Sequence, residues 1–453
     1  MKVIRDVVHG YIELCDDDIR IIDTPHFQRL KSIKQNNPFS AYPCANHTRF
    51  EHSLGVMHLG VKVFKSLKEK EDENNKNLLN DKSEKTVKYA CLLHDVGHAP
   101  FSHYGEQFFD RDELKDLFSE KLKERDIDKA IAYENAGAPH EICSCILSLD
   151  KYGDLLENIG VDLELFCRMI IGMYYPPEKN DYRNLLIDIL NSNIDVDKLD
   201  YVLRDSYMSG AKLVVLDVDR LISAYMIYDE RIAFSGKSLS TISNLIYGRE
   251  AVYTWIVNHH VNVYTGRVLT KLIKTAFQTE EDEADYFSYN AVSERLVDDH
   301  DIVSFIRSKR TEDQKIGDLY EQLFSRKFFK SVWKNEPEFN KCIPNEVRQN
   351  DFKSIIGENL QDPDSAEEVI AEKISVKPED ILISVADFKP FEPFGLTASR
   401  NKRHPVYIII NGEPVTFEKI FTGTIHKNRE PLLPLLFVRT EDAKTKFLEE
   451  YGR

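Results

Sequence analysis

The chain has 453 residues, of which 42% are hydrophobic and 30% charged, a balance typical of a soluble globular protein with one large domain or two to three smaller ones. Its formal net charge of −16 argues against a broad nucleic-acid-binding face, because duplex binding needs many cationic contacts to phosphate. The charge does not exclude a pocket for a small anion, since local Arg and Lys side chains can reverse a negative background.

Signals for targeting and membrane insertion are not evident. Residues 1–14 contain no long apolar core and no small-residue cleavage site, and no segment approaches the roughly 18 apolar residues of a membrane span. The seven cysteines are scattered, apart from Cys143 and Cys145, which have no second pair at zinc-site spacing. We therefore expect a cytoplasmic protein with reduced thiols and no membrane partner.

Helical patterns dominate the first 280 residues. Apolar residues recur at near-helical spacing over 21–33 and 50–64, and residues 88–97 predict a short buried helix that stops at Gly97. The charged run 68–85 predicts a solvated helix end followed by a loop. Further helices are expected at 140–150, 162–174, 183–191, 197–208 and 240–276.

The composition changes after about residue 278. Helical patterns return at 292–308 and 315–334, and the clearest strand patterns are residues 380–388 and 404–412. We therefore predict a mainly α fold, with a helical core over residues 1–280 and a smaller α/β lobe over residues 281–453.

Four polar residues are embedded in apolar segments, namely His52, His94, Asp95 and Asp197. A buried imidazole or carboxylate without a partner costs free energy, so these groups need partners. Two imidazoles and two carboxylates suit one divalent Fe, Mn, Ni or Zn ion and leave positions open for water and substrate. The plainer alternative is that a single histidine such as His52 is a hydrogen-bonded core residue.

The order of these residues resembles the HD-domain metal phosphohydrolases, whose signature is a His, a His-Asp pair and a later Asp. Five stretches are similar to the deoxynucleoside triphosphate (dNTP) triphosphohydrolases related to the SAM-and-HD-domain enzyme: DVVHGYIEL, IIDTPHFQRLKSIKQ, HTRFEHSLGV, LLHDVGHAPFSH and IDVDKLDYVLRD. The resemblance covers roughly residues 1–270, and no SAM domain is expected. It implies that the helical core is an HD-type catalytic domain.

The resemblance also implies a reaction and a ligand set. One divalent transition metal ion would be held by His52, His94, Asp95 and Asp197, and Mg²⁺ would accompany the nucleotide. A dNTP would be hydrolysed at the α-phosphorus to a deoxynucleoside and inorganic triphosphate. This chemistry needs metal-polarised water, cations around the phosphates and an acid for the leaving 5′-oxygen.

Further residues receive roles from the same resemblance. Those that match substrate contacts are Gln35, Arg49, Lys198, Tyr201, Asp205, Arg249 and Tyr253. Those that match the phosphate pocket and proton transfer are His98, His103, Glu106 and His140, of which we favour His140 as the general acid. Val257 stands where the family usually has Tyr, which leaves the preferred base open.

Plainer roles are open for several of these residues. Arg49 or Lys198 could form a surface salt bridge. Asp200 and Arg204, at i and i+4, could simply pair with each other. His103 could be structural and brace its loop. Tyr253, Trp255 and Val257 could be ordinary core residues of their helix.

Many members of this branch are activated by nucleotides bound between subunits. The residues that match the regulatory nucleotide site are Lys2, Val3, Arg5, Asp23, Gln28 and Lys31. Arg5 stands where the family has Asn and Lys31 where it has Arg. Lys lacks the planar fork that reads guanine at two points, which argues against a guanine-specific activator. A nucleotide activator is one interpretation of these residues, and the plainer one is that Asp23 caps or pairs locally within IIDTP. We expect a homo-oligomer, either a dimer or a tetramer.

Two other functions are compatible with part of this pattern. An HD-family phosphohydrolase acting on a nucleoside monophosphate or a cyclic nucleotide would release orthophosphate or a linear monophosphate. A nucleotide-sensing or nucleic-acid-binding module with weak catalysis would conflict with the intact ligand set and the negative charge. Product analysis tests the first, and binding without turnover would favour the second.

Overall fold

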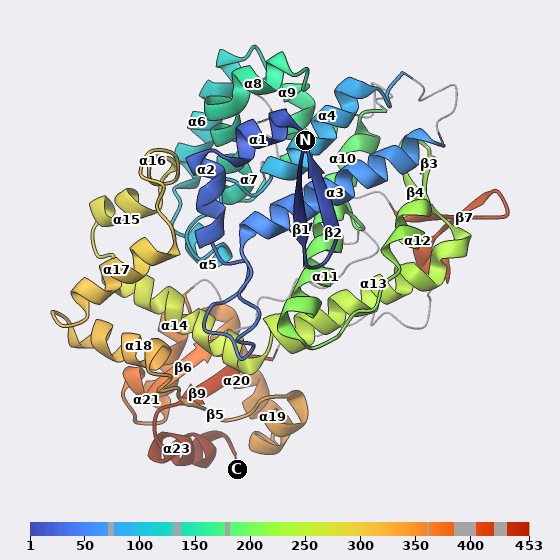
Figure 1. Cartoon of the computed structure of the whole chain (residues 1–453). Coiled ribbons are helices and arrows are strands. Elements are labelled where there is room, and N and C mark those ends of the chain that lie inside the picture. The colour runs from blue at the N-terminus through green and yellow to red at the C-terminus, as the bar shows by residue number, and fades with distance from the viewer. Residues whose placement is uncertain are drawn as a thin grey trace.

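The computed structural model of the chain describes residues 1–70, 77–128, 131, 137–176, 182–359, 362–384, 405–420 and 433–452. Helices dominate this part of the chain, and three small sheets accompany them (Figure 1). The predicted mainly α fold is confirmed. Within the described ranges, no helix combines the length and the apolar character needed to cross a membrane.

Several helices of the first 280 residues pack on the long helix α3, among them α4 and α11, whereas α14 lies beside α17 and α18 (Figure 1). The helices of this part of the chain are α1 (Asp16–Ile22), α2 (Pro25–Arg29), α3 (Arg49–Lys68), α4 (Asp81–Leu93), α5 (His103–Glu106), α6 (Arg111–Glu124), α7 (Pro139–Leu147), α8 (Gly153–Asn158), α9 (Leu163–Ile171), α10 (Asn184–Leu190), α11 (Val196–Ser209), α12 (Val218–Ser223), α13 (Leu239–Val252) and α14 (His260–Ala276).

More helices follow residue 280, and short helical turns occur along the whole described chain. The later helices are α15 (Glu280–Tyr286), α16 (Tyr289–Ser293), α17 (Asp299–Lys309), α18 (Gln314–Phe324), α19 (Glu336–Cys342), α20 (Glu346–Glu358), α21 (Pro363–Lys373), α22 (Phe417–Ile420) and α23 (Glu441–Tyr451). The turns are η1 (Leu30–Ser32), η3 (Ser148–Tyr152), η5 (Gly236–Ser238), η6 (Tyr253–Val257) and η7 (Pro378–Asp380).

The three sheets have simple orders. β1 (Lys2–Asp6) and β2 (Gly10–Leu14) form an antiparallel hairpin. The second sheet has the order β3 (Tyr225–Tyr228), β4 (Arg231–Ser235), β7 (Tyr407–Ile410), β8 (Glu413–Thr416). The third has the order β5 (Lys330–Ser331), β9 (Leu435–Val438), β6 (Ile381–Ser384). In the second sheet β4 and β7 pair in parallel, so a late hairpin joins an early one.

Helix α3 organises the first half of the molecule. Its start is fixed by a capping box, in which the Thr48 amide donates to Glu51 Oε2 at 2.9 Å. Val56 and Phe64 are fully buried. Because the helix packs against both α4 and α11, it holds together three segments that carry predicted site residues.

Two hydrophobic clusters form the interior. The first is built largely on α3, α4, α7, α9 and α10 and includes Ile408 of β7. The second is built on α14, α17, α18, α20 and α21, and it includes Phe101 from the loop that precedes α5. Each cluster therefore contains residues from both sides of position 280. The boundary between residues 1–280 and 281–453 stays a prediction.

The helix predicted at residues 88–97 begins and ends earlier than expected. α4 starts inside the charged run, where the Asn80 side chain accepts from the Ser83 amide at 3.0 Å, and it ends at Leu93. His94 and Asp95 therefore lie at and beyond the helix end, in a turn rather than on a helical face.

Other predicted elements are present with interruptions. Residues 240–276 form two helices, because His259 takes an extended ψ and its side chain caps α14. Residues 292–308 are divided between α16 and α17, and α18 stops at Phe324. The two strand patterns contain β6 and β7, while residues 385–388 and 404 lie outside the described residues. The hairpins β1–β2 and β3–β4 were not predicted.

Candidate metal centre

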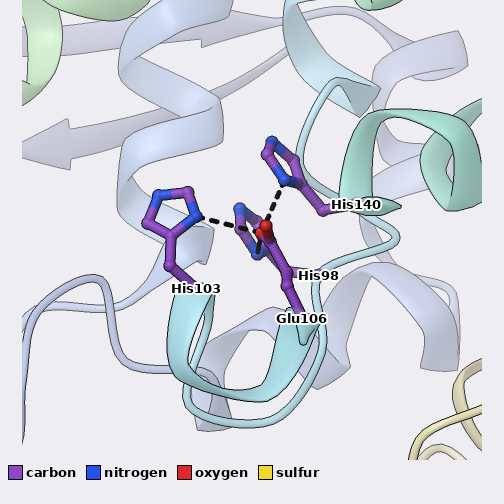
Figure 2. A group of neighbouring side chains, drawn as sticks. All are labelled: His98, His103, Glu106 and His140. Carbon is purple, nitrogen blue, oxygen red and sulfur yellow. Dashed lines mark hydrogen bonds and ion pairs between the residues drawn. The ribbon is translucent and has the colours of Figure 1, made fainter. Parts of the chain in front are cut away.

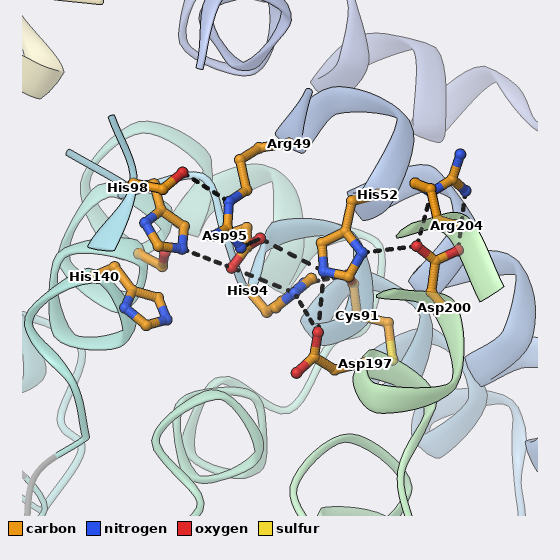
Figure 3. A network of polar contacts seen from close by, with 12 residues as sticks. Arg49, His52, Cys91, His94, Asp95, His98, His140, Asp197, Asp200 and Arg204 are labelled. Atoms are coloured by element: carbon orange, nitrogen blue, oxygen red, sulfur yellow. Dashed lines mark hydrogen bonds and ion pairs between the residues drawn. The ribbon is translucent and has the colours of Figure 1, made fainter. Parts of the chain in front are cut away.

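Two buried imidazoles aim unpartnered nitrogens at one point (Figure 3). His52, on α3, places Nδ1 2.7 Å from Asp200 Oδ2, and His94, at the end of α4, places Nδ1 2.9 Å from the Cys91 carbonyl. A carboxylate and a carbonyl accept hydrogen bonds, so Nδ1 carries the proton in both rings. Each Nε2 is then the nitrogen that can bind a metal ion in place of a proton, the arrangement found in metal-binding histidines.

Two carboxylates complete this group. Asp197 Oδ1, from the first turn of α11, lies 3.0 Å from His52 Nε2 and 3.8 Å from His94 Nε2. Asp95 lies 3.6 Å from His52 Nε2 through Oδ2 and 3.4 Å from His94 Nε2 through Oδ1. All four predicted ligands are thus brought together from three elements. Their two nitrogen and two carboxylate donors fit a divalent transition metal ion.

The electrostatics of the centre favour positive charge. Burial acts to lower the pKa of His52, but the carboxylates of Asp197 and Asp200 raise that pKa to about 10. Burial acts to raise the pKa of Asp95, but the Arg49 guanidinium and the nearby imidazoles hold that pKa well below its usual range. A proton or a cation at this point is therefore stabilised by ionised carboxylates.

A buried network fixes the orientation of His52. Asp200 accepts from Arg204 Nε at 2.8 Å and lies 2.6 Å from His9 Nε2. Arg204 also donates to Asp6 Oδ2 at 2.8 Å. The pairing of Asp200 with Arg204 is the plainer alternative that the sequence left open, and it is present. In this position the pair also holds the ligand histidine.

Gly55 makes room for this network. It lies on α3 one turn after His52, and a Cβ there would overlap Asp200 Oδ1 and approach Arg204 Nη2 to 2.5 Å. The buried ion pair can lie against α3 only because this residue has no side chain. The glycine is part of the stretch "RFEHSLG" that also contains His52.

Arg49 connects the centre to the loop that precedes α5. Its Nη1 donates to Asp95 Oδ2 at 2.7 Å and its Nε donates to Ser102 Oγ at 3.0 Å. Its Nη2 lies 3.5 Å from His103 Nε2. Arg49 is buried, so the surface salt bridge that the sequence left open is not what it forms. It presents a cation beside the carboxylates.

The loop before α5 contains two residues in the left-handed region, Phe101 at φ 58° and Ser102 at φ 54°. Non-glycine residues occupy this region at an energetic cost, which surrounding contacts must offset. Asp299, at the start of α17, accepts from the Phe101 amide at 2.6 Å and from the Lys34 amide at 3.0 Å. Ser102 Oγ donates to the Lys34 carbonyl at 2.6 Å. These contacts hold the strained turn beside Arg49.

Four predicted residues form a second group next to the first, which we call the His–Glu cluster: His98, His103, Glu106 and His140 (Figure 2). Glu106 Oε1 lies 3.2 Å from His98 Nδ1, 3.0 Å from His103 Nδ1 and 2.6 Å from His140 Nδ1. The rings of His98 and His140 stack, with centroids 4.0 Å apart. His103 is the exposed member, while His98 is fully buried.

The members of the His–Glu cluster differ in their pKa shifts and therefore in their protonation at neutral pH. Burial acts to lower the pKa of His140, but Glu106 raises that pKa to about 9. Burial acts to raise the pKa of Glu106, but His140 and His103 hold it well below its usual range. Burial and the positive charge of Arg49 keep the pKa of His98 well below its usual range. At neutral pH the cluster therefore contains a protonated His140 and an ionised Glu106.

Four of the predicted substrate-binding residues form two sets of contacts near α11. One set involves Lys198, and the other involves Tyr201, Arg249 and Tyr253. Lys198 pairs through Nζ with the buried Asp195, which also accepts from the Lys198 amide at 2.8 Å. Arg249 Nε donates to Tyr201 Oη at 2.8 Å, and its guanidinium lies 5.0 Å from the centroid of the Tyr253 ring.

The remaining predicted contacts are Gln35 and Asp205. Asp205 Oδ1 lies 2.8 Å from His47 Nε2 and accepts from Asn36 Nδ2 at 2.8 Å. Gln35 Oε1 is buried without a hydrogen-bond partner among the described residues, and the Gln35 amide donates to the His47 carbonyl at 3.1 Å. An unpartnered buried oxygen at this place is suited to a ligand hydroxyl.

The predicted regulatory residues lie on the N-terminal hairpin and the helical segments that follow it. Lys2 Nζ donates to Asp23 Oδ2 at 3.3 Å, and Lys31 Nζ donates to Gln28 Oε1 at 2.7 Å. Arg5 lies over the ring of Tyr11, 4.9 Å from its centroid. Val3 is exposed on β1. The residues form local pairs rather than one closed pocket within the described part of a single chain.

Several residues that support the site had no role in the sequence-based prediction. They are His9, His47, Gly55, Ser102, Asp195 and Asp299. All of them except Asp299 lie inside the recognised stretches, so a signal was present. Asp299 lies 198 residues from Phe101 and had no local signal.

Two stretches of the chain match known protein families. Residues 49–201 match the family described as HD domain, and residues 216–403 match the one described as HD associated region. The deoxynucleoside triphosphate triphosphohydrolase SAMHD1 homolog of Dictyostelium discoideum is 32% identical over 334 residues, which cover 73% of this chain and 58% of that protein. Human deoxynucleoside triphosphate triphosphohydrolase SAMHD1 is 27% identical over 413 residues, which cover 85% of this chain and 62% of that protein.

A solved structure shares the fold. The crystal structure of a hypothetical protein from Aquifex aeolicus superposes with a TM-score of 0.69 at 21% identity, covering 98% of this chain and 99% of that chain. The helical fold and the two-histidine, two-aspartate site define an HD-domain protein. The chain belongs to the HD-domain phosphohydrolase superfamily and is similar there to the dNTP triphosphohydrolases. It spans between 58% and 62% of the length of these two curated relatives.

Proposed function

We propose that the chain is a metal-dependent dNTP triphosphohydrolase. The observation that carries this proposal is the pair of unpartnered Nε2 atoms of His52 and His94, which face Asp95 and Asp197 beside the Arg49 cation. The names of the two curated relatives support the choice of a dNTP as substrate.

A divalent Fe, Mn, Ni or Zn ion would be held by His52, His94, Asp95 and Asp197. When bound there, such an ion supplies a Lewis acid that lowers the pKa of water and offsets phosphate charge. Mg²⁺ would accompany the nucleotide, as it does for triphosphates generally.

The residues around the centre would bind and orient the nucleotide. Arg49 and Lys198 supply cations for the phosphates, with Tyr201 and Arg249 beside them. Lys198 must leave Asp195 to reach a phosphate, and Asp195 stays satisfied by the amides of Ser192 and Lys198. Asp205 and Gln35 would bind the sugar, with Tyr253 close by. Oriented charges of this kind stabilise the charge that builds on phosphate oxygens.

The His–Glu cluster would supply the proton that the leaving 5′-oxygen needs. His140 is the proposed general acid, because its pKa of about 9 keeps it protonated at neutral pH. Glu106 holds the imidazolium in place through Oε1 and stabilises its charge. His98 and His103 lie against the same carboxylate and extend the cluster toward Arg49, where they can donate hydrogen bonds to phosphate oxygens.

Hydrolysis in ¹⁸O-labelled water tests the site of attack. The proposal predicts that the label enters inorganic triphosphate and that the deoxynucleoside carries none. Label in orthophosphate would instead indicate a phosphatase acting at a terminal phosphate. Label in a linear monophosphate made from a cyclic nucleotide would indicate a phosphodiesterase.

Regulation, assembly and location belong to the same proposal. A nucleotide would bind at the surface that carries Lys2, Asp23 and Gln28, between subunits of a dimer or tetramer. The exposed Val3 on this surface is an apolar residue that a second subunit could cover. All seven cysteines are free, which suits the cytoplasm. Sedimentation of the chain with and without mixed nucleotides tests the assembly.

A further inference from the structure

Several buried nitrogen atoms of the His–Glu cluster have no hydrogen-bond partner among the described residues. Neither ring nitrogen of His98 has a hydrogen-bond partner among the described residues, and His140 Nδ1 also has none. Glu106 Oε1 is close to both Nδ1 atoms, but neither contact has hydrogen-bonding geometry. A buried polar atom left unpaired destabilises the fold, so an occupant that accepts these lone pairs is expected.

The four donors converge as metal ligands do. One ligand atom from each of His98, His103, Glu106 and His140 lies within 4.8 Å of the others, and the Nδ1 atoms of all three histidines lie 2.6–3.2 Å from Glu106 Oε1 (Figure 2). They come from the turn after α4, from α5 and from the start of α7. The geometry points to a second cation site, in which three imidazoles and one carboxylate bind a divalent transition metal ion next to the His52, His94, Asp95 and Asp197 centre. Imidazole-rich sets of this kind suit Zn, Co, Ni, Fe and Mn.

The backbone around His98 holds the site in place before any ion arrives. The His98 carbonyl accepts from Arg29 Nη2 at 2.8 Å, and the Gly97 amide donates to Ser144 Oγ at 2.9 Å. A Cβ at Gly97 would overlap the α7 backbone, so the turn packs directly on the helix that carries His140. His98 Nε2 lies 3.3 Å from Asp95 Oδ1, which brings the two sites into contact.

A second ion would have a consequence for turnover, and this consequence rests on the proposed function. A metal ion on His140 Nδ1 takes the place of the proton that faces Glu106, so the ring is no longer an imidazolium. An ion in the His–Glu cluster therefore removes the proposed general acid. Excess transition metal should fill this site and inhibit hydrolysis, while the first ion supports it.

Cobalt stoichiometry tests the site without reference to activity. The full chain is stripped with a chelator, loaded with Co²⁺, desalted and measured for cobalt and for its visible absorption bands. We expect two ions per chain in the wild type and one in Asp197→Ala. Glu106→Gln and His103→Ala should each bind the second ion at least about tenfold more weakly. His103 is 66% exposed in its side chain, so removing it does not open the core.

His300→Ala is the matched control, because His300 is also an exposed histidine close to a carboxylate, Asp298. It should keep two ions. One cobalt per chain in the wild type, or two tightly bound ions in both cluster variants, would overturn the second site. The outcomes separate the two proposals. Two cobalt sites, with no hydrolysis of any dNTP at any loading from one equivalent to excess, would retain the site and reject the function. Hydrolysis by a protein that never binds more than one ion would do the reverse.

Discussion

His52 Nδ1 lies 2.7 Å from Asp200 Oδ2, and this contact decides which nitrogen of the histidine faces the candidate metal centre. Asp200 is buried, is paired with Arg204 and has no exposed edge. The ligand histidine is therefore oriented by a carboxylate that does not itself bind the metal. Partners of this kind influence metal affinity through ring orientation and ligand basicity.

Asp200→Asn should weaken metal binding while the four ligands remain. The amide replaces one acceptor oxygen with a donor, which then faces either His52 or Arg204. We expect a loss in metal affinity of about 10- to 100-fold. A competitive chelator titration measures it. Asp219→Asn is the control, because Asp219 pairs with Lys62 at the surface, and an equal affinity in both variants would show that Asp200 has no orienting role.

Gly55→Ala should destabilise the protein and disturb the centre. The added Cβ overlaps the Asp200–Arg204 pair, and overpacking of this kind costs roughly 1–3 kcal/mol. Gly357 on α20 is the matched control, since it is exposed and has nothing within 4 Å of an added Cβ. Alanine there should stabilise the helix by about 0.5–1 kcal/mol. Denaturant unfolding of both variants checks the contrast, and equal effects would contradict it.

Asp197→Ala and Lys198→Ala should separate metal binding from substrate binding. The first variant loses a ligand, so the ion held by His52, His94 and Asp95 should be lost together with turnover. The second keeps the metal but lacks a phosphate cation, so kcat/KM should fall by about 10²-fold. Metal analysis and steady-state kinetics on the same samples check this. Full activity in Asp197→Ala would reject the ligand assignment.

Asp299 should make stability depend on pH. Burial raises the pKa of its carboxyl from 3.8 to about 6, although the Phe101 and Lys34 amides oppose the change. Between these two values the folded chain holds a proton that the unfolded chain has released. This group's contribution therefore falls as pH rises from about 4 to about 6, by up to about 3 kcal/mol. Asp299→Asn should flatten that part of the profile in denaturant unfolding, and parallel profiles would contradict the assignment.

Much of the centre was predictable because its signals are local. The stretches around His52, His94 and Asp197 combine apolar helical spacing with isolated polar residues, and burial then requires partners. The cap of α3 is also local, since Thr48 and Glu51 are three residues apart. These features predict where helices begin and which side chains turn inward.

Other features depend on contacts between distant segments. Asp299 supports Phe101 across the chain, and the pairing of β7 with β4 joins residues that are far apart in sequence. The interruption at His259 was missed because helical spacing continues on both sides of it. Asp200 looked like a local partner of Arg204, and only the approach of α3 shows its contact with His52.

Phosphorus analysis of the products tests the central claim most directly. The full chain, loaded with one equivalent of Mn²⁺, is incubated with Mg²⁺ and an equimolar mixture of the four dNTPs, which also supplies any nucleotide activator. The account predicts deoxynucleoside and inorganic triphosphate in equal amounts, and none of either with Asp197→Ala. Release of orthophosphate or pyrophosphate, or no turnover by the metal-loaded wild type, would contradict it.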